Sequence, residues 1–160
     1  MDDLNFLQSK NEQALKQFQQ WKSAGDTIVF TNGCFDLIHP GHVALLNLCK
    51  KLGKRLIVGL NSDSSIQQLK GPERPILALE TRYILLNALK PVDLVWIFKE
   101  ETPENLIKRV NPDVLAKGGD YIKSTIVGAD FVEANGGEVV IIPLLEGYST
   151  TSLINKIKQI

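Results

Sequence analysis

Five short runs rich in apolar and β-branched residues alternate with stretches of helical period along this 160-residue chain. Strands that alternate with helices of this length are typical of βαβ units, whose strands form a parallel sheet. The runs lack strict apolar–polar alternation, which is typical of strands covered by helices on both faces. The apolar runs are 27–30, 56–60, 94–98, 114–116 and 139–142. The main helical stretches are 43–52, 81–89, 103–110 and 127–134.

The pattern predicts a single α/β domain built on an open, Rossmann-like doubly wound sheet of about five parallel strands. Ligands of such sheets bind beyond the carboxyl ends of the strands. We expect 26–160 to form this domain and 1–25 to form a helical extension. Apolar residues at helical spacing predict an amphipathic helix over 11–23; these residues are Ala14, Leu15, Phe18 and Trp21. Because Phe18 and Trp21 can pack on the same chain or on a second copy, a homo-oligomer stays open.

The charge balance argues against partners with an extended negative surface. Eighteen basic and eighteen acidic residues cancel, so no overall basic field favours nucleic acid or an anionic membrane. No apolar run approaches the ~20 residues of a membrane helix, and the acidic start at 1–4 lacks the pattern of a signal peptide. The two cysteines, Cys34 and Cys49, do not suggest a disulfide framework. We therefore expect a cytoplasmic chain that holds small molecules in a local site.

Two helix boundaries carry local signals. At 102–104, a threonine, a proline and a glutamate predict an N-cap at Thr102, followed by a first-turn proline and a favourable acid. Gly53 follows the helical stretch 43–52 and predicts its stop. The glycine pair at 136–137 breaks the chain before the last strand.

The two histidines of the chain, His39 and His42, lie three residues apart after the first predicted strand. Pro40 and Gly41 between them predict a helix start, where free amides and the helix dipole favour an anion. Imidazoles can also donate hydrogen bonds to phosphate oxygens and stabilise charge that develops during transfer. Gly33 permits the backbone turn of a phosphate-binding loop. The segment therefore predicts a phosphate-handling site.

Two other interpretations of this segment stay open. Four of its side chains have metal-ligand chemistry, although a structural zinc site usually shows paired cysteines or more histidines. Glycine and proline also form plain turns without any chemistry. A P-loop lysine and a spaced dinucleotide-binding glycine pattern are both missing. The four possible ligands are Cys34, Asp36, His39 and His42.

A second cluster of polar residues lies near the carboxyl end of the chain. Ser149, Thr150 and Thr151 precede an apolar stripe of helical spacing in 153–160. Serine and threonine are favoured at helix N-caps. A helix start with several hydroxyls is also a site for the outer phosphates of a nucleotide, and the two roles are compatible.

These two segments together resemble the signatures of the cytidylyltransferase-like nucleotidyltransferases. Residues 33–42 resemble the first signature, with its two histidines, and 146–152 resemble the second, a hydroxyl-rich helix start. The resemblance covers 27–160 and implies that a nucleotide binds at the carboxyl end of the sheet. The nucleotide-binding residues that it implies are Asn32, Gly33, Cys34, Phe35, His39, Gly41, His42, Lys117, Gly118, Gly119, Ser149, Thr150 and Thr151.

The resemblance also implies roles in the reaction. His39, His42 and Lys70 are expected to be catalytic, by stabilising charge on the reacting phosphates. Ser149 to Thr151 would hold the β- and γ-phosphates of the leaving pyrophosphate. The residues expected to bind the acceptor are Asp36, Lys70, Arg82 and Asp120.

Three of the polar residues have equally good alternatives. Asp36 would orient the acceptor sugar or a metal-bound water, or it would cap the turn before His39. Arg82 would lie near the acceptor phosphate or form an ion pair on the helix surface with Glu80 or a neighbouring residue. Arg74 would clamp a sugar phosphate or belong to an exposed loop.

Within the family, 31–36, 117–121 and 136–139 resemble the members that adenylylate heptose 1-phosphate. This resemblance implies that ATP and the sugar phosphate give ADP-heptose and pyrophosphate, a step in making the lipopolysaccharide inner core. Mg²⁺ would bridge phosphate oxygens, with few protein ligands of its own. The chain resembles the stand-alone form of this activity rather than the form fused to a kinase.

Rival functions remain within and outside the family. Glycerol-3-phosphate cytidylyltransferases tend to carry an arginine where this chain has Leu144, which favours ATP over CTP here. An FAD-synthetase-like adenylyltransferase is another rival. A nucleotide-binding regulatory module without turnover would not need both histidines, Lys70 and the hydroxyl cluster together.

Overall fold

The computed structural model describes residues 4–119 and 121–159, and the strands in this part form one parallel sheet. Its order is β3-β2-β1-β4-β5, and each neighbouring pair is parallel. This arrangement confirms the predicted Rossmann-like α/β fold. The strands are β1 (Ile28–Gly33), β2 (Arg55–Asn61), β3 (Leu94–Phe98), β4 (Val114–Gly118) and β5 (Glu138–Ile142).

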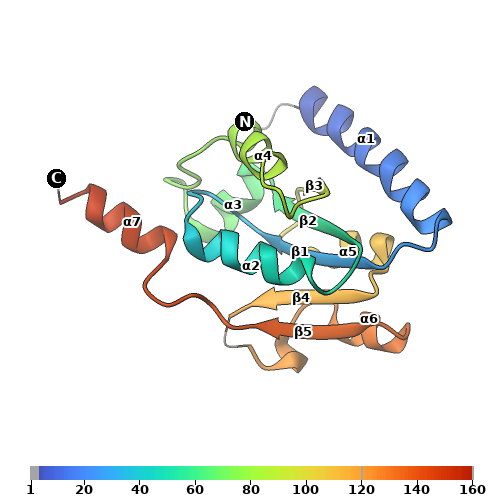
Figure 1. Cartoon of the computed structure of the whole chain (residues 1–160). Helices are drawn as coiled ribbons and strands as arrows, with labels where there is room; N and C mark the ends of the chain where they lie inside the picture. The colour runs from blue at the N-terminus through green and yellow to red at the C-terminus, as the bar shows by residue number, and fades with distance from the viewer. Residues whose placement is uncertain (1–3, 120, 160) are drawn as a thin grey trace.

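Helices cover both faces of the sheet (Figure 1). In this view α2 crosses in front of the strands, whereas α5 and α6 lie behind them. The helices are α1 (Leu4–Ser23), α2 (Pro40–Lys50), α3 (Asp63–Lys70), α4 (Leu79–Asn87), α5 (Glu104–Val110), α6 (Ala129–Ala134) and α7 (Thr150–Ile157). A 3₁₀ turn, η1 (Lys123–Thr125), precedes α6. None of the described helices is both long and apolar enough to span a bilayer.

The core consists of two clusters, one on each face of the sheet. In the first, α1, α5 and α6 contribute Phe18, Ile107 and Val132. In the second, α2 and α4 contribute Leu46 and Leu86. Strand residues enter both clusters, which is why the strands show apolar runs rather than strict alternation.

The strand order creates a switch point between β1 and β4. From β1 the chain proceeds through β2 to the edge strand β3, and it then returns to place β4 on the other side of β1. The connections leave the carboxyl ends of β1 and β4 in opposite directions, so a crevice opens between them. Open sheets of this kind bind ligands at such a crevice.

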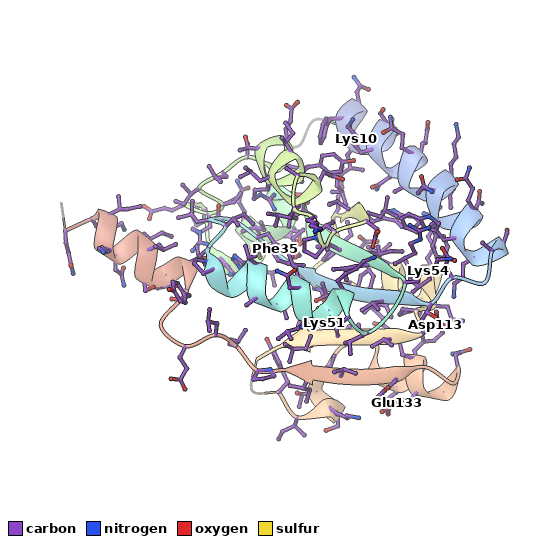
Figure 2. All side chains as sticks on the ribbon, viewed as in Figure 1. Lys10, Phe35, Lys51, Lys54, Asp113 and Glu133 are labelled. Atoms are coloured by element: carbon purple, nitrogen blue, oxygen red, sulfur yellow. The ribbon has the colours of Figure 1, made fainter. Side chains whose placement is uncertain are left out.

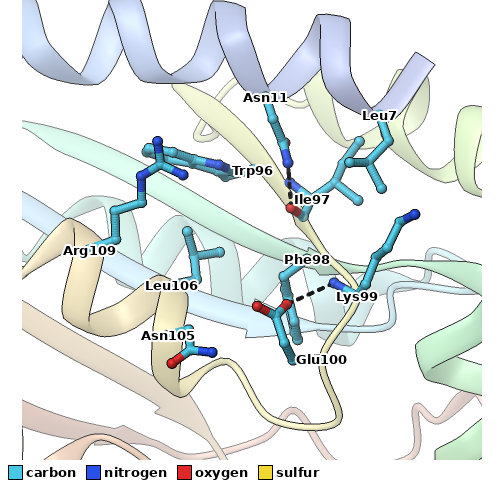
Figure 3. A pocket seen from close by; sticks show the side chains of 10 residues that line it. All are labelled: Leu7, Asn11, Trp96, Ile97, Phe98, Lys99, Glu100, Asn105, Leu106 and Arg109. Carbon is cyan, nitrogen blue, oxygen red and sulfur yellow. Dashed lines mark hydrogen bonds between the residues drawn. The ribbon is translucent and has the colours of Figure 1, made fainter. Parts of the chain in front are cut away.

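Helix α1 covers the first face of the sheet and also the edge strand β3. The Asn11 amide donates to the Ile97 carbonyl at 2.8 Å and accepts from the Ile97 amide at 3.0 Å, as a neighbouring strand would (Figure 3). This pairing blocks part of an edge that would otherwise be open to another chain. The helix begins at Leu4, earlier than the predicted 11–23, because Phe6 and Leu7 also pack on the core.

Both predicted boundary signals were wrong in detail. Pro103, not Thr102, occupies the N-cap of α5, and no side-chain hydrogen bond caps this helix. Helix α2 ends before Lys51, so Gly53 is not its stop. A Cβ at Gly53 would lie 2.7 Å from Val29 Cγ2. Glycine is therefore needed there because the turn into β2 passes close to β1.

The two ends of the sheet have different chemistry (Figure 2). Phe35 lies toward the end from which α7 projects, whereas Lys54 and Asp113 lie toward the opposite end. At that opposite end, charged side chains pair with one another or with the main chain. Asp26 pairs with Lys54 and Arg55, and Asp113 accepts from the Ile28 amide at 2.7 Å. The predicted site residues lie toward the carboxyl end of the sheet, where ligands of such sheets bind.

Candidate active site

The two histidines lie side by side at the start of α2. His39 is the N-cap residue with extended backbone, and Pro40 opens the helix, as predicted. The imidazole rings of His39 and His42 stack with centroids 3.8 Å apart and planes 21° apart. Pro40 has no N–H and the amides of His42 and Val43 donate to the His39 carbonyl, so what favours an anion beside the pair is chiefly the positive end of the helix dipole.

Glycine residues make room for this stack. A Cβ at Gly41 would lie 3.0 Å from two ring atoms of His39, so the ring folds over the first turn only because position 41 is glycine. A Cβ at Gly33 would likewise lie 3.1 Å from the Phe35 ring. Both glycines serve the geometry of the histidine segment.

Phe35 supports the stack from behind. Its φ of 44° lies in the left-handed region, which costs a residue with a Cβ about 1–3 kcal/mol. The ring is buried, and its centroid lies 5.1 Å from that of His42. The buried Phe35 ring holds His42 in place, and the predicted nucleotide contact of Phe35 stays a prediction.

Both imidazoles are neutral near pH 7. Burial lowers the pKa of His42 to about 4, and the charges of His39 and Lys70 lower it further against an opposing contact with the Leu37 backbone. Burial also lowers the pKa of His39. Among the described residues, Nδ1 of each ring is shielded from solvent without a hydrogen bond of normal geometry. The site thus holds two neutral imidazoles with open hydrogen-bonding atoms.

This depressed pKa predicts an acid-dependent loss of stability. Below pH 6.5 the unfolded chain protonates His42 before the folded protein does, so the free energy of unfolding falls until about pH 4. After allowance for solvent screening, the loss from pH 7 to pH 5 that His42 causes is about 1 kcal/mol. Urea unfolding of the wild type and of His42→Gln at both pH values measures it. The variant should lose less stability on acidification, and equal losses would contradict the burial of a neutral imidazole.

Asp36 has a structural role that the sequence interpretation missed. Its buried carboxylate pairs with Arg74 Nε at 2.7 Å and accepts from the amides of Ile76 and Leu77 at 2.8 and 2.9 Å. Burial alone would raise the pKa of Asp36, but the two amides and the guanidinium lower it overall. The predicted contact of Asp36 with substrate or metal-bound water is therefore wrong, and so is a cap before His39. Asp36 ties the loop at 74–77 to the histidine segment.

Arg82 is also structural. It is fully buried, and its guanidinium donates to the carbonyls of Leu77, Cys34 and Asn61 at 2.7–3.0 Å. It pairs with Asp63 at 2.6 Å. These contacts rule out both predicted roles, a phosphate contact and a surface pair with Glu80, because the donors are committed inside the protein. Arg82 links the ends of β1 and β2 to the start of α3.

Lys70 and Arg74 lie on the histidine side of the sheet. Lys70 ends α3, is exposed, and is near enough to His42 for its charge to act on that ring. Arg74 is only 16% exposed in its side chain, and it is not the free loop residue of one prediction. Its Nη2 is shielded from solvent and has no hydrogen-bond partner among the described residues.

Lys117 spans the crevice between β1 and β4. Its Nζ donates to Asn32 Oδ1 at 3.0 Å, and burial lowers its pKa. The two glycines that follow allow close packing inside the chain: a Cβ at Gly118 would meet Leu45 at 2.9 Å, and one at Gly119 would meet the Tyr121 ring at 2.8 Å. Asp120, predicted to bind the acceptor, lies outside the described residues.

The amino terminus of α7 approaches the histidines. Ser149 caps the helix, because its side chain accepts from the Ser152 amide at 3.0 Å. Thr150 and Thr151 form the first turn, as predicted. The Tyr148 ring lies 6.5 Å from the His39 ring, with planes 18° apart. Tyr148 was missed by sequence reasoning, although its place directly before the cap was a usable signal.

The structure thus gathers most of the predicted site at one corner. The amino termini of α2 and α7 face the same region, with Lys70 beside them. Among the residues that the structure describes, no group of three or more His, Cys, Asp or Glu side chains could hold a metal ion. A separate hollow of about 280 Å³ lies beside α1 and α5, and no histidine lines it (Figure 3). The corner is suited to stabilising phosphate charge.

Comparisons with known proteins agree with this geometry. Residues 30–155 match the cytidylyltransferase-like family model, and the chain belongs to this family of nucleotidyltransferases. The chain is also similar to a solved structure, the lipopolysaccharide core biosynthesis protein from Thermoplasma volcanium GSS1. That match has a TM-score of 0.61 and 29% identity, and covers 78% of this chain and 100% of the other.

Curated relatives are similar over most of this chain. The bifunctional protein HldE of Hyphomonas neptunium is 54% identical over 138 residues, which is 86% of this chain and 28% of that protein. HldE of Gluconobacter oxydans is 50% identical over 143 residues, or 89% of this chain and 30% of that protein. The chain therefore spans less than a third of the length of these relatives.

Proposed function

We propose that this domain is an adenylyltransferase that converts ATP and D-glycero-D-manno-heptose 1-phosphate to ADP-heptose and pyrophosphate, for lipopolysaccharide core synthesis. One observation carries the transfer chemistry: the stacked histidines lie against Tyr148, which immediately precedes the capped start of α7. Two helix amino termini and two imidazoles thus converge where phosphates would react. The Thermoplasma relative, named for lipopolysaccharide core biosynthesis, supports the pathway, and the motif resemblance supports the heptose.

The reaction is a direct in-line displacement at phosphorus. An oxygen of the sugar 1-phosphate attacks the α-phosphorus of ATP and forms a new P–O bond. The bond from the α-phosphorus to the bridging oxygen breaks, and pyrophosphate leaves with that electron pair. Because the attacking phosphate is already ionised, no general base is needed. Catalysis is then a matter of positioning and charge stabilisation.

The neutral state of the histidines fits this mechanism. Each neutral imidazole offers one N–H donor to a phosphate oxygen and gives up no proton during the step. His39 and His42 would stabilise the α-phosphoryl oxygens, and Lys70 would neutralise charge beside them. The amides and hydroxyls at the start of α7 would hold the leaving group. Lys117 and Asn32, which are hydrogen-bonded to each other at the switch point, would contact the nucleotide.

Mg²⁺ fits as a partner of the nucleotide rather than of the protein. Two carboxylates at this end of the sheet, Asp36 and Asp63, are engaged by arginine and main-chain donors. The donor set therefore suits an ion that arrives bound to the phosphates of ATP, where it supplies charge neutralisation.

A pyrophosphate-release assay tests the function. The protein is incubated with Mg²⁺ and each pairing of ATP or CTP with heptose 1-phosphate or glycerol 3-phosphate. We expect release only with ATP and the heptose phosphate. Release with CTP and glycerol 3-phosphate would support nucleotidyl transfer but contradict the proposed substrates. ATP binding without release from any pair would favour another acceptor or a non-catalytic module.

The organisation around the site completes the proposal. We propose that 26–160 form the catalytic domain and that 1–25 form an extension, of which α1 covers the sheet. The place of action would be the cytoplasm, where ATP and sugar phosphates are found. A homo-oligomer remains compatible with this arrangement.

A further inference from the structure

Tyr148 brings the segment before α7 into contact with the histidine helix, α2. It directly precedes Ser149, the N-cap residue of α7. A Cβ at Gly41 would lie 3.4 Å from Tyr148 Cβ and 3.0 Å from two atoms of the His39 ring. Tyr148 and His39 therefore lie beside each other over the same glycine, in the first turn of α2.

Four rings follow one another at this corner of the domain. The centroids of Phe35 and His42 lie 5.1 Å apart, those of His42 and His39 lie 3.8 Å apart, and those of His39 and Tyr148 lie 6.5 Å apart. In the last two pairs the ring planes are nearly parallel, at 21° and 18°. Aromatic pairs attract one another at centroid distances up to about 7 Å. His39 thus has two ring neighbours, His42 from its own helix and Tyr148 from the segment before α7.

The two ends of this row of rings are held differently. Phe35 is buried at 3% exposure, whereas Tyr148 is 47% exposed. Tyr148 follows Gly147, whose φ of 83° turns the chain toward α7. None of the described residues of α7 is buried, and the helix projects from the body of the domain (Figure 1). The Tyr148 ring therefore stays beside His39 only while the segment before α7 lies on α2.

The place of His39 matters for the proposed transfer. A misplacement of about 1 Å at a reacting centre can cost roughly 100-fold in rate. His42 is backed by the buried Phe35 ring, but His39 is only half-buried and starts the helix. A ring beside His39 limits the orientations that its imidazole can adopt.

We propose that Tyr148 is a positioning residue for the transfer: its ring packs beside His39 and keeps that imidazole stacked on His42 while the segment before α7 lies on α2. The inference rests on the proposed nucleotidyl transfer and adds to it a residue that acts through His39 rather than on the substrates. The arrival of the α7 segment and the alignment of the two histidines then form a single step. The flat ring is what acts, so the hydroxyl of Tyr148 is dispensable.

Three substitutions of Tyr148 separate the ring from its bulk and its hydroxyl. Tyr148→Phe keeps the ring, Tyr148→Leu keeps an apolar side chain without a ring, and Tyr148→Ala removes both. Pyrophosphate release with varied ATP measures kcat and KM. We expect alanine and leucine to lower kcat about tenfold, with KM for ATP changed less than about twofold, and phenylalanine to restore kcat. Ile157→Ala is the control, because Ile157 is exposed on the same helix, and it should behave as the wild type does.

Proton NMR of the histidine rings tests the contact without turnover. The chain has two histidines, so their Hε1 signals are easily assigned. Burial lowers the pKa of His39 in the wild type. Each variant keeps Lys70 and His42, so a changed titration of His39 reports the side chain at position 148. We expect Tyr148→Ala to shift the Hε1 signal of His39 and to raise its pKa toward the ordinary value, and Tyr148→Phe to do neither.

Three results would overturn the inference. Tyr148→Ala could leave the His39 signal and titration unchanged, or it could raise KM for ATP at constant kcat, as the loss of a substrate contact would. Tyr148→Leu could also match Tyr148→Phe in kcat, as it would if the side chain only anchored α7. A wild type that releases no pyrophosphate with any substrate pair would contradict the proposed function instead, and the NMR titration would still decide whether Tyr148 holds His39.

Discussion

Replacing His42 with alanine is expected to lower kcat about 100- to 1,000-fold, while KM for ATP changes by less than about fivefold. The physical reason is the position of this ring. It is held between His39 and Phe35, and burial keeps it neutral, so in the proposed mechanism its donor would meet the reacting phosphate without rearrangement. Steady-state pyrophosphate release with varied ATP measures both constants.

The matched control for this variant is Asn47→Ala. Asn47 is exposed on the same helix, and its side chain donates to the Val43 carbonyl at 2.8 Å. It should retain wild-type kinetics. Circular dichroism confirms that each variant is folded, and His42→Gln keeps more of the side-chain volume if alanine disturbs the stack. An unchanged kcat in folded His42→Ala would remove His42 from the catalytic step.

Replacing Arg82 with methionine is expected to destabilise the protein by about 3–5 kcal/mol. The change leaves the Asp63 carboxylate without its cation and removes the donor from three carbonyls in the interior. Urea unfolding, followed by tryptophan fluorescence, measures the free energy of unfolding. A loss of this size identifies a structural arginine, whereas an arginine that only binds phosphate would barely affect the stability of the free protein.

Arg109→Met is the control for this measurement. Arg109 lies over the Trp96 ring at 5.1 Å, a contact worth about 0.5–1 kcal/mol at an exposed site. The two variants remove the same charge, so the difference between them reports burial and hydrogen bonding. If Arg82→Met lost no more stability than Arg109→Met, the structural role assigned to the buried hydrogen bonds of Arg82 would be contradicted.

Prediction of the strands failed mainly at their carboxyl ends. The first run was expected to end at residue 30, but β1 continues through Thr31 and Asn32 to Gly33. The fourth was expected to end at residue 116, but β4 includes Lys117 and Gly118. Apolar patterning identifies strands by what they bury. It therefore misses the polar strand ends, which in this fold border the ligand crevice.

Among the site residues, too, those with local sequence signals were recognised and those with distant partners were not. His39, His42 and the Ser149 cap were recognised because their signals are local: a proline–glycine pair at a helix start, and hydroxyls before an apolar stripe. Asp36 and Arg82 also lie within or near recognisable motifs, and their predicted substrate contacts were wrong. Their partners, 38 and 48 residues away in sequence, include Arg74 and Cys34. Local patterns carry no information about such pairs.

The sequence by itself determined the parallel α/β class, the order of the elements and the two helix starts that can bind phosphate, because periodicity and capping depend on neighbours within a few residues. Only the tertiary structure decided which charges remain free for a ligand. Folding buries Asp36 and Arg82, whose contacts hold the loops around the site together, and it leaves Lys70 and Lys158 exposed at the edge of an open cleft. The physical reason is that the partners of a charged side chain are distant in sequence. The crossovers between strands bring these partners beside it, and they decide whether the charge is paired inside the protein or remains available to a ligand.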